Sequence, residues 1–518
     1  MKNIAHTLTF AGAAVFVFAG ILNAQVATKI RWACVGNSIT QGTTGATNAY
    51  PVRLGTRLLM DTVLNAGVGW RTMLRSGDST YWKYGRFAQV FAFQPDIVSI
   101  DLGTNDSKPI NWKDSANFLR DTRDMIDTLA NMPSHPRIFL IYPTPTFNNE
   151  NVTPEPSDLI RESVIRYGVI PRLRQVAIEK GVDTIDTHTP FLGRSNLFGS
   201  DGVHPTTPGY DSIAAYIFRA YLSKVTRIAV VGNSITEYIN SGVSGAVAGE
   251  AYAMKLNMLL GRNVYTENDG RSGCYLQKPG GITPAIMSYW TQSGGKLTNV
   301  FNLKPHVITI MLGTNDSRPK SWNTARYVND YKALIDTFSN NISPKPQIYL
   351  VKPIGAWKVN GHWGFGNPSS DTSNGINGDI IRDSVVPAIQ QVALAKGLPV
   401  IDLYNHPSFN SALPQPASPL MSGDGVHPFR TGHDTIAHIF YRSLASVTSI
   451  ESGKQSLLNP VRSSKASLIP VLSPLRLDGQ VYSLDGKSTQ QDGGQIPAGV
   501  YIVKPGDKTT PQPSNSRK

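Results

Sequence analysis

At 518 residues, with two-fifths apolar side chains, the chain is long enough to bury more than one hydrophobic core, which excludes an intrinsically disordered protein. The formal net charge of +13 is spread along the chain without clusters of Lys and Arg interleaved with aromatics, so we expect no nucleic-acid partner. Two cysteines alone, Cys34 and Cys274, at non-equivalent places, exclude a disulfide framework.

The N-terminal segment has the pattern of an export signal. The basic residue Lys2 precedes an apolar run from Leu8 to Leu22, which the small residue Ala24 follows. This pattern predicts a secretory signal peptide over residues 1–24 and places the mature protein outside the cell or on its surface. An uncleaved membrane anchor is the alternative, which the shortness of the apolar run disfavours. No later segment is long and apolar enough to cross a bilayer, so we expect no transmembrane segment after signal removal.

Residues 25–224 form a first repeat, in which short apolar runs alternate with segments of helical periodicity. This alternation predicts a mostly parallel sheet with helices on both faces, which is a three-layer α/β/α sandwich. The predicted strands are Ile30–Val35, Val63–Asn65, Ile97–Leu102, Ile138–Tyr142 and Thr184–Asp186. The predicted helices include Val52–Met60, Ser115–Leu129, Leu159–Lys180 and a closing helix, Asp211–Leu222.

Residues 225–449 repeat the same plan. The predicted strands are Arg227–Val231, Val264–Asn268, Val307–Leu312, Gln347–Lys352 and Val400–Asp402, and the closing helix is Thr435–Leu444. Almost no linker separates the repeats near Lys224, so we expect two tandem domains in a fixed relation.

The C-terminal part changes in composition. Residues 450–471 are rich in Ser, Pro and Lys, which predicts a linker, and residues 472–518 contain two strand-like runs, Val481–Lys487 and Ile496–Lys504. This small β tail resembles the C-terminal sorting domain of the type IX secretion system. The resemblance implies that secretion machinery is a partner at both ends of the chain, with a small structural cap as the alternative.

Four short blocks recur in the same order in both repeats. They are Val35–Thr40 and Val231–Thr236, Asn65–Arg71 and Asn268–Cys274, Leu102–Ser107 and Leu312–Ser317, and Asp201–Pro205 and Asp424–Pro428. The first three lie just past predicted strands, at the sheet edge where ligands of open α/β folds bind. Any single block has an ordinary structural explanation as a turn or a helix cap, but their recurrence in the same order favours a site.

Ester hydrolysis needs an activated nucleophile, a base and donors aimed at the developing oxyanion, and the blocks supply each group. An Asp and a His three residues apart can meet on one turn and orient the imidazole toward a serine. The residues that we assign to these roles are Ser38, Asp201 and His204 in the first repeat and Ser234, Asp424 and His427 in the second, with the amides of Asn105 and Asn315 as oxyanion donors.

Together these residues resemble the SGNH hydrolase family, also called the GDSL esterase family, over the whole length of each repeat. The resemblance implies flavodoxin-like sheets and carries the family's serine, asparagine and Asp-x-x-His onto the residues above. Its oxyanion glycine falls on Gly273, five residues after Asn268, but the same count from Asn65 reaches Trp70, with Gly69 one residue earlier. A bulky side chain disfavours the glycine conformation and crowds the acyl pocket, so the first repeat is either a second catalyst or a degenerate site that still binds sugar.

The resemblance narrows to secreted bacterial carbohydrate acetylesterases. In both repeats Gly-Thr-Asn-Asp-Ser precedes a basic residue, a proline and a tryptophan, Trp112 or Trp322, and a longer loop in the second repeat contains Trp357 and Trp363. These rings are candidate sugar-stacking platforms, although packing in the core explains them equally well.

No cluster of His, Cys, Asp and Glu has metal-ligand spacing, so we expect no metal and no cofactor. The hypothesis is a secreted Ser-His-Asp esterase that removes O-acetyl groups from a polysaccharide or oligosaccharide, such as plant cell-wall polysaccharide. The alternatives are a lipase, arylesterase or thioesterase of the same fold, and a glycan-binding surface protein without catalysis.

Overall fold

The computed structural model describes residues 30–43, 45–58, 62–238, 250–280, 287–291, 296–359, 362–363, 375–409 and 420–456, together with two short strands at 481–482 and 502–503. The chain divides into two compact units, Met1–Lys454 and Gln455–Lys518. The predicted signal peptide and most of the predicted linker and tail lie outside the described residues.

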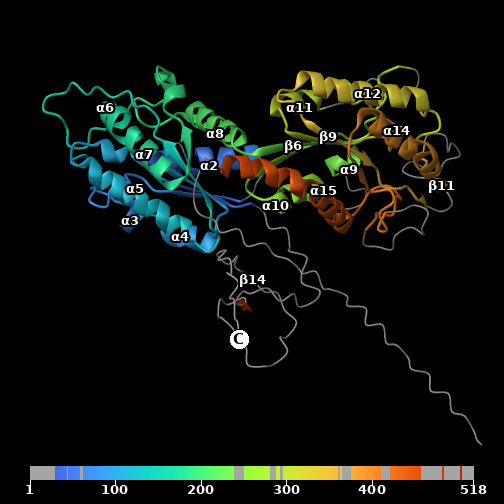
Figure 1. The fold of residues 1–518 in the computed structure, drawn as a ribbon. Coiled ribbons are helices and arrows are strands. Elements are labelled where there is room, and N and C mark those ends of the chain that lie inside the picture. The colour runs from blue at the N-terminus through green and yellow to red at the C-terminus, as the bar shows by residue number, and fades with distance from the viewer. Residues whose placement is uncertain are drawn as a thin grey trace, which may run out of the picture. The chain divides into compact units, whose positions relative to one another are not determined.

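The first repeat contains one sheet of five parallel strands (Figure 1). Its order is β2 (Val63–Gly67), β1 (Trp32–Gly36), β3 (Ile97–Asp101), β4 (Arg137–Tyr142) and β5 (Asp183–Asp186). This 2-1-3-4-5 order is that of flavodoxin-like folds, and it confirms the predicted fold class. Strands β1 and β3 are buried along their whole length, as expected for strands covered by helices on both faces.

Helices cover both faces of this sheet because alternate residues of each strand point to opposite sides. Trp32 and Cys34 pack with α2 (Tyr50–Leu58) and α8 (Thr207–Leu222). Ala33 and Val35 pack on the other face with α5 (Ser115–Ala130), α7 (Ile170–Lys180) and α4 (Phe87–Phe93).

The second repeat has the same architecture. Its strands lie in the order β7 (Val264–Gly270), β6 (Thr226–Gly232), β8 (Val307–Met311), β9 (Gln347–Lys352) and β12 (Val400–Asp402), again parallel. Residues of α10 (Tyr252–Leu260) and α15 (Arg430–Ser456) pack on one face. The other face packs with α11 (Leu297–Leu303), α12 (Thr324–Asn341) and α14 (Val386–Lys396).

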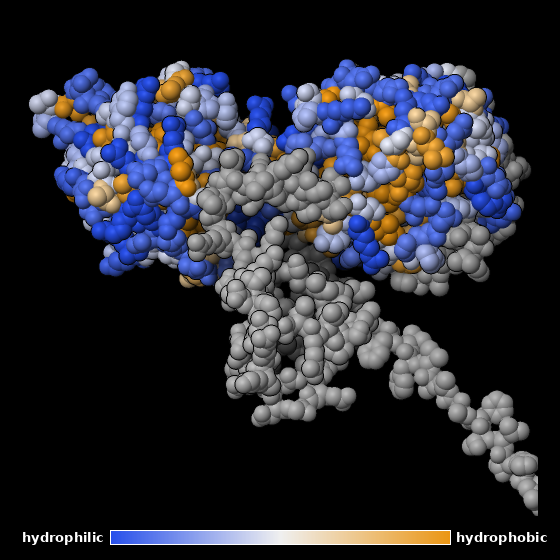
Figure 2. Space-filling model, viewed as in Figure 1, coloured by the Kyte–Doolittle hydropathy of each residue, from blue (hydrophilic) through white to orange (hydrophobic). Residues whose placement is uncertain are grey.

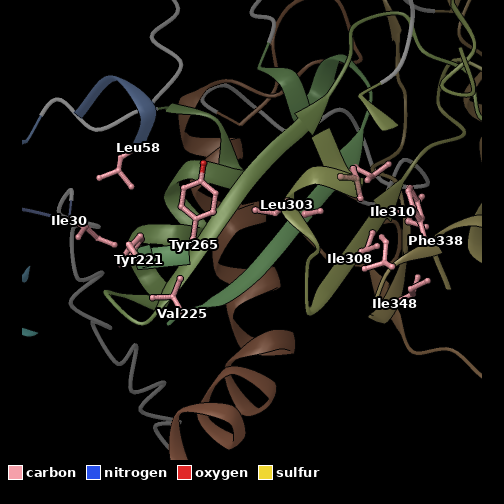
Figure 3. Packing of buried hydrophobic residues seen from close by; sticks show 14 of the residues in the cluster. Ile30, Leu58, Tyr221, Val225, Tyr265, Leu303, Ile308, Ile310, Phe338 and Ile348 are labelled. Atoms are coloured by element: carbon pink, nitrogen blue, oxygen red, sulfur yellow. The ribbon is translucent and has the colours of Figure 1, made fainter. Parts of the chain in front are cut away.

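One hydrophobic cluster contains residues of both repeats. Tyr221 at the end of α8, Val225 in the short connection and Tyr265 on β7 belong to it (Figure 3). The guanidinium of Arg137 also donates to the side chain of Asn263, at 3.0 Å. Residues of both repeats thus contact one another near Lys224.

Several helices differ from the predicted spans. The long helix expected at Leu159–Lys180 is a short helix, α6 (Glu162–Val164), a π-helical turn at Ile165–Val169 and then α7, and the second repeat has the equivalent turn at Ile381–Val385. A proline follows each π turn, and because proline has no N–H, the regular helical hydrogen-bond ladder is interrupted there. The last helix, α15, is longer than expected and ends at Ser456.

The two described strands of the tail, β13 (Val481–Tyr482) and β14 (Ile502–Val503), pair in antiparallel fashion. They fall within the two predicted strand-like runs. No helix among the described residues meets the length and hydropathy needed for a membrane span. On the face seen in Figure 2 the first repeat is mostly hydrophilic, whereas apolar side chains gather over part of the second.

Candidate active site

Each predicted nucleophile is the first residue of a short helix at the end of a central strand. In the first repeat β1 ends at Gly36 and α1 (Ser38–Gln41) follows, with the side chain of Asn37 accepting the Ile39 N–H at 2.8 Å. A Cβ on Gly36 would lie 2.0 Å from the Thr40 hydroxyl oxygen, so this turn requires glycine. The asparagine thus serves as the helix cap, and the serine is left for another role.

The second repeat builds the same turn. Helix α9 (Ser234–Glu237) follows β6, and Asn233 caps it by accepting the Ile235 N–H at 3.1 Å. A Cβ on Gly232 would again lie 2.0 Å from a threonine hydroxyl, that of Thr236. Two independent copies of the sequence block therefore fold into one local structure.

In the first repeat, serine, histidine and aspartate form a continuous chain of hydrogen bonds. The Ser38 hydroxyl lies 2.8 Å from Nε2 of His204, and Nδ1 of His204 lies 2.6 Å from Asp201. The other oxygen of Asp201 accepts the N–H groups of Val203 and His204. Partial burial raises the pKa of Asp201, but hydrogen bonds from the His204 ring and from these backbone groups outweigh it, so the net shift is downward.

The second repeat has the same chain of contacts. The Ser234 hydroxyl lies 2.8 Å from Nε2 of His427, whose Nδ1 lies 2.6 Å from Asp424. Asp424 has one donor more than Asp201, because the Ser422 hydroxyl donates to it at 2.6 Å. Gly199 occupies the position of Ser422 in the first repeat, where it makes the same backbone hydrogen bond to the histidine carbonyl.

The two triads differ in exposure to solvent. The side chains of Asp201 and His204 are 50% and 31% exposed, whereas those of Asp424 and His427 are 12% and 5% exposed. A short hairpin, β10 (Lys358–Val359) with β11 (His362–Trp363), follows β9 in the second repeat. Val359 lies against the turn at Gly425, next to Asp424, so this hairpin contributes to covering the second triad.

Asn105 and Asn315 lie on equivalent turns beyond β3 and β8. Asn105 donates one amide hydrogen to the carbonyl of Arg71 at 3.2 Å, and Asn315 donates to the carbonyl of Cys274 at 3.0 Å. This bond fixes each side chain and leaves the second amide hydrogen for a ligand.

The buried aspartates that follow these asparagines are functional candidates that the sequence reasoning missed. Asp106 accepts the N–H groups of Met73 and Leu74, and Asp316 accepts those of Leu276 and Gln277. Burial raises the pKa of Asp106 to about 7 and that of Asp316 to about 6. Each aspartate ties the loop after the second strand of its repeat to the turn that carries the asparagine. The signal was present, since a carboxyl recurs at the same place in both repeats.

Trp70 adopts the backbone conformation that we expected a bulky residue to avoid. Its φ is +69°, and that of Gly273 at the equivalent position is +72°. The expectation that tryptophan would not take the glycine conformation is therefore wrong, although this region is unfavourable for a non-glycine residue. The N–H of Gly69 donates to Gln41 at 2.7 Å, whereas the N–H groups of Trp70 and Gly273 have no hydrogen-bond partner among the described residues.

The four predicted stacking tryptophans do not form exposed platforms. Trp112 and Trp322 are half-buried beside Phe118 and Tyr327, with ring centroids 5.4 and 5.0 Å apart. Trp357 is 5% exposed and belongs to a core cluster, while Trp363 packs against Gly378. Their placement favours the packing alternative.

The remaining histidines and cysteines form no metal site within the described ranges. His188 contacts Glu162 at 2.8 Å, and His433 is buried between aromatic rings, where burial lowers its pKa to about 3. Both cysteines are buried, which raises their thiol pKa to about 12. None of these side chains joins the triads.

Comparison with known proteins adds family evidence. Residues 34–211 and 230–435 match the family described as GDSL-like Lipase/Acylhydrolase family. A curated relative, the acetylxylan esterase of Xylanibacter ruminicola, is 37% identical over 213 residues, which cover 37% of this chain and 43% of that protein. The match thus spans less than half the length of this relative.

Parts of the chain are also similar to solved structures. The lipase/acylhydrolase from Enterococcus faecalis is 20% identical, with a TM-score of 0.31, and the match covers 37% of this chain and 94% of that one. Est24, a carbohydrate acetylesterase from Sinorhizobium meliloti, is 14% identical, with a TM-score of 0.33, over 43% of this chain and 99% of that one.

Proposed function

Since the chain belongs to the GDSL-like lipase/acylhydrolase family, we propose that it is a carboxylic ester hydrolase and that both repeats remove O-acetyl groups from carbohydrate by a Ser-His-Asp mechanism. The observation that carries this proposal is the unbroken chain of hydrogen bonds from serine to histidine to aspartate in each repeat. Two independent copies with equal distances are hard to explain by packing alone.

In the second repeat the Ser234 oxygen attacks the ester carbonyl carbon while Nε2 of His427 takes its proton. The imidazolium then gives this proton to the leaving sugar oxygen, which yields an acetyl-serine. Water, deprotonated by the same nitrogen, attacks the acetyl group, and acetate leaves as Ser234 regains its proton. Asp424 holds the imidazole and stabilises its positive charge in both steps.

The oxyanion donors in the second repeat are the N–H groups of Ser234 and Gly273 and the amide of Asn315. Loss of one such donor typically costs about 3 kcal/mol of transition-state stabilisation. In the first repeat Ser38, Trp70 and Asn105 have these roles. Trp70 is a better candidate than Gly69, because the Gly69 N–H already donates to Gln41.

The acetylated-xylan type of substrate is supported by the acetylxylan esterase relative. A lipase, arylesterase or thioesterase would use the same triad with a broad apolar channel for the acyl group. A glycan-binding protein without catalysis would not need, in each repeat, a histidine within hydrogen-bond distance of the serine.

The test is acetate release from acetylated xylan, xyloglucan, pectin and sialosides by wild type, Ser38→Ala, Ser234→Ala and the double variant. We expect activity on at least one polysaccharide, partial loss in a single variant and complete loss in the double variant. In a comparison of short and long acyl esters, preference for long chains would refute the carbohydrate proposal, and acetate release by the double variant would refute the mechanism.

We also propose that the chain is exported, with residues 1–24 as the signal peptide and residues 472–518 as a sorting tail that engages secretion machinery. Mass spectrometry of the protein recovered outside expressing cells measures both ends. A mature N-terminus at Gln25 supports export, and retention of the chain inside the cell with Met1 intact contradicts it.

A further inference from the structure

Trp70 differs from every other tryptophan of the chain in its exposure. The sequence contains eight tryptophans, and the structure describes all of them. Seven are buried or half-buried, whereas Trp70 is 64% exposed. Exposure of this large apolar ring and its positive φ are both unfavourable for the folded state, so a compensating role is expected at this position.

The backbone that carries this exposed ring lies beside the nucleophile of the first triad. A Cβ on Gly69, the preceding residue, would lie 3.9 Å from the Cβ of Ser38. On its other side the Trp70 ring centroid is 4.8 Å from the ammonium of Lys108, three residues beyond Asn105. Trp70 therefore lies between the segment that carries the nucleophile and the segment that carries the oxyanion amide.

A buried polar network holds Lys108 beneath the ring. The lysine side chain is 1% exposed, and its ammonium pairs with Asp78 at 2.9 Å. The other oxygen of Asp78 accepts from the amide of Asn111, which also donates to the carbonyl of Asn105 at 2.8 Å. A cation fixed close to an indole ring restrains the ring by cation–π attraction. The exposed indole is thus pre-organised relative to the catalytic groups.

The second repeat offers a contrast at the same place. Gly273 has the same backbone conformation as Trp70, and a Cβ built there would meet no atom within 4 Å among the described residues. A lack of space is therefore not the reason why the second repeat has no side chain at this position. At this position an aromatic side chain is present in the first repeat and absent from the second.

We propose that Trp70 is a sugar-stacking residue that determines the specificity of the first site. Its indole face packs against the C–H face of the pyranose ring whose ester Ser38 attacks, while its own N–H serves the oxyanion. The ligand class is a pyranose unit of an acetylated polysaccharide, and this assignment rests on the proposed function of the first repeat. Aromatic faces and the C–H surfaces of sugars are complementary, and a restrained ring loses little entropy on binding.

The kinetic test uses the full chain with Ser234→Ala, so that all measured hydrolysis comes from the first site. Trp70→Gly and Trp70→Phe are compared on an acetylated xylo-oligosaccharide and on ethyl acetate, which has no ring to stack. We expect Trp70→Gly to lower kcat/KM on the sugar about tenfold more than on ethyl acetate, mainly through KM, since aromatic contacts have about this effect. Trp70→Phe should retain most of the kcat/KM on the sugar, because phenylalanine keeps an aromatic face.

Tyr167→Ala is the matched control, because this aromatic side chain is 68% exposed and belongs neither to the triad nor to the proposed oxyanion donors. It should leave both substrates unaffected. Equal losses on both substrates in Trp70→Gly would show that the tryptophan acts through its backbone alone, and would overturn the proposal. A third substrate is a hydroxycinnamoyl ester of a simple alcohol, which has an aromatic acyl group and no sugar. If Trp70→Gly lowers kcat/KM on this ester as much as on the sugar, Trp70 stacks on the acyl group, and the proposal is also overturned.

A binding measurement separates this proposal from the proposed function. Calorimetric titration of the Ser38→Ala/Ser234→Ala chain with a deacetylated xylo-oligosaccharide needs no turnover. We expect Trp70→Gly in that chain to weaken binding about tenfold. If the Ser234→Ala chain hydrolyses no ester but Trp70→Gly still weakens sugar binding, the catalytic role of the first repeat fails and the stacking role stands. Unchanged binding would refute the stacking role.

Discussion

The two triads have equal hydrogen-bond distances but very different surroundings. Ser38 and Ser234 each lie 2.8 Å from their histidine, and each histidine lies 2.6 Å from its aspartate. Yet the side chain of Asp201 is half exposed, while that of Asp424 is 12% exposed. The strand ends and turns of the shared fold fix the triad geometry, whereas access to solvent depends on what each repeat places around it.

The surroundings follow from the segment after the fourth strand of each sheet. In both repeats a backbone N–H of this segment, from Phe147 or Trp357, donates to the glycine carbonyl of the Asp-Gly turn. Only the second repeat then continues into the hairpin β10–β11 among the described residues. An enclosed triad has stronger electrostatic interactions, and an open triad gives freer access to a polymer. The contrast predicts different sensitivities of the two sites to the same substitution.

The largest difference should come from the triad aspartates. We expect Asp424→Asn, in a Ser38→Ala chain, to lower kcat of the second site about 10³- to 10⁴-fold, because the histidine loses its orienting charge. Asp201→Asn, in a Ser234→Ala chain, should cost the first site roughly tenfold less, because water reaches its imidazolium. Acetate release at saturating substrate measures both, and equal losses would show that enclosure does not matter for the triad.

The oxyanion amides should show the next largest effect, and one that is alike in both sites. We expect Asn105→Ala and Asn315→Ala each to lower kcat about 10²- to 10³-fold with little change in KM, since the amide acts on charge that develops in the transition state. Asn341→Ala, an exposed position on α12, is the control. A main effect on KM would assign these amides to substrate binding instead.

Much of this site was accessible from the sequence. Tandem blocks located the serines, histidines, aspartates and asparagines because the chemistry is concentrated where strands end, and the strands themselves were apparent as apolar runs. The surroundings of the site could not be predicted in this way. The exposure of Asp201 and the burial of Trp357 depend on a segment whose path no periodicity predicts.

The backbone of Trp70 illustrates a second limit. Residue preferences argue against a positive φ for tryptophan, but the loop is held from both sides, by Gln41 before it and by Asp106 after it. Tertiary contacts therefore impose a conformation that the residue alone disfavours. The recurrence of Asp106 in both repeats marks it in the sequence, but what it holds in place is known only from its backbone partners.

A buried carboxyl in the first repeat predicts a pH-dependent difference in stability. Asp101, paired in register with Gly36, is buried, which raises its pKa to about 7, and the second repeat has Met311 at this place. Because the folded pKa is raised, the contribution to stability is complete below about pH 4 and is lost as pH rises through about 7. We expect Asp101→Asn to increase the free energy of unfolding at pH 8.5 by on the order of 2 to 4 kcal/mol and at pH 5 by only about 1 kcal/mol, because most of the loss falls between pH 5 and pH 7.

Denaturant unfolding of the full chain at both pH values measures this effect. Asp106 and Asp316 titrate in the same range, so only the difference between variant and wild type reports on Asp101. Asp114→Asn, at an exposed helix cap where both residues serve equally well, is the control. A gain in stability that is equal at pH 5 and pH 8.5 would contradict the assignment to Asp101 ionisation.

The smallest effect concerns the extra donor to Asp424. Removing it by Ser422→Ala should lower kcat/KM of the second site about tenfold, since a hydrogen bond to a charged group is lost while two backbone donors remain. The reciprocal change, Gly199→Ser, places a hydroxyl beside Asp201, because a Cβ on Gly199 lies at an ordinary 3.6 Å from its oxygen. We expect a gain of roughly two- to fivefold in the first site, smaller because the carboxyl is half exposed. Gly199→Ala adds the Cβ without the hydroxyl, and an equal gain from it would assign the effect to loop rigidity rather than to the donated hydrogen bond.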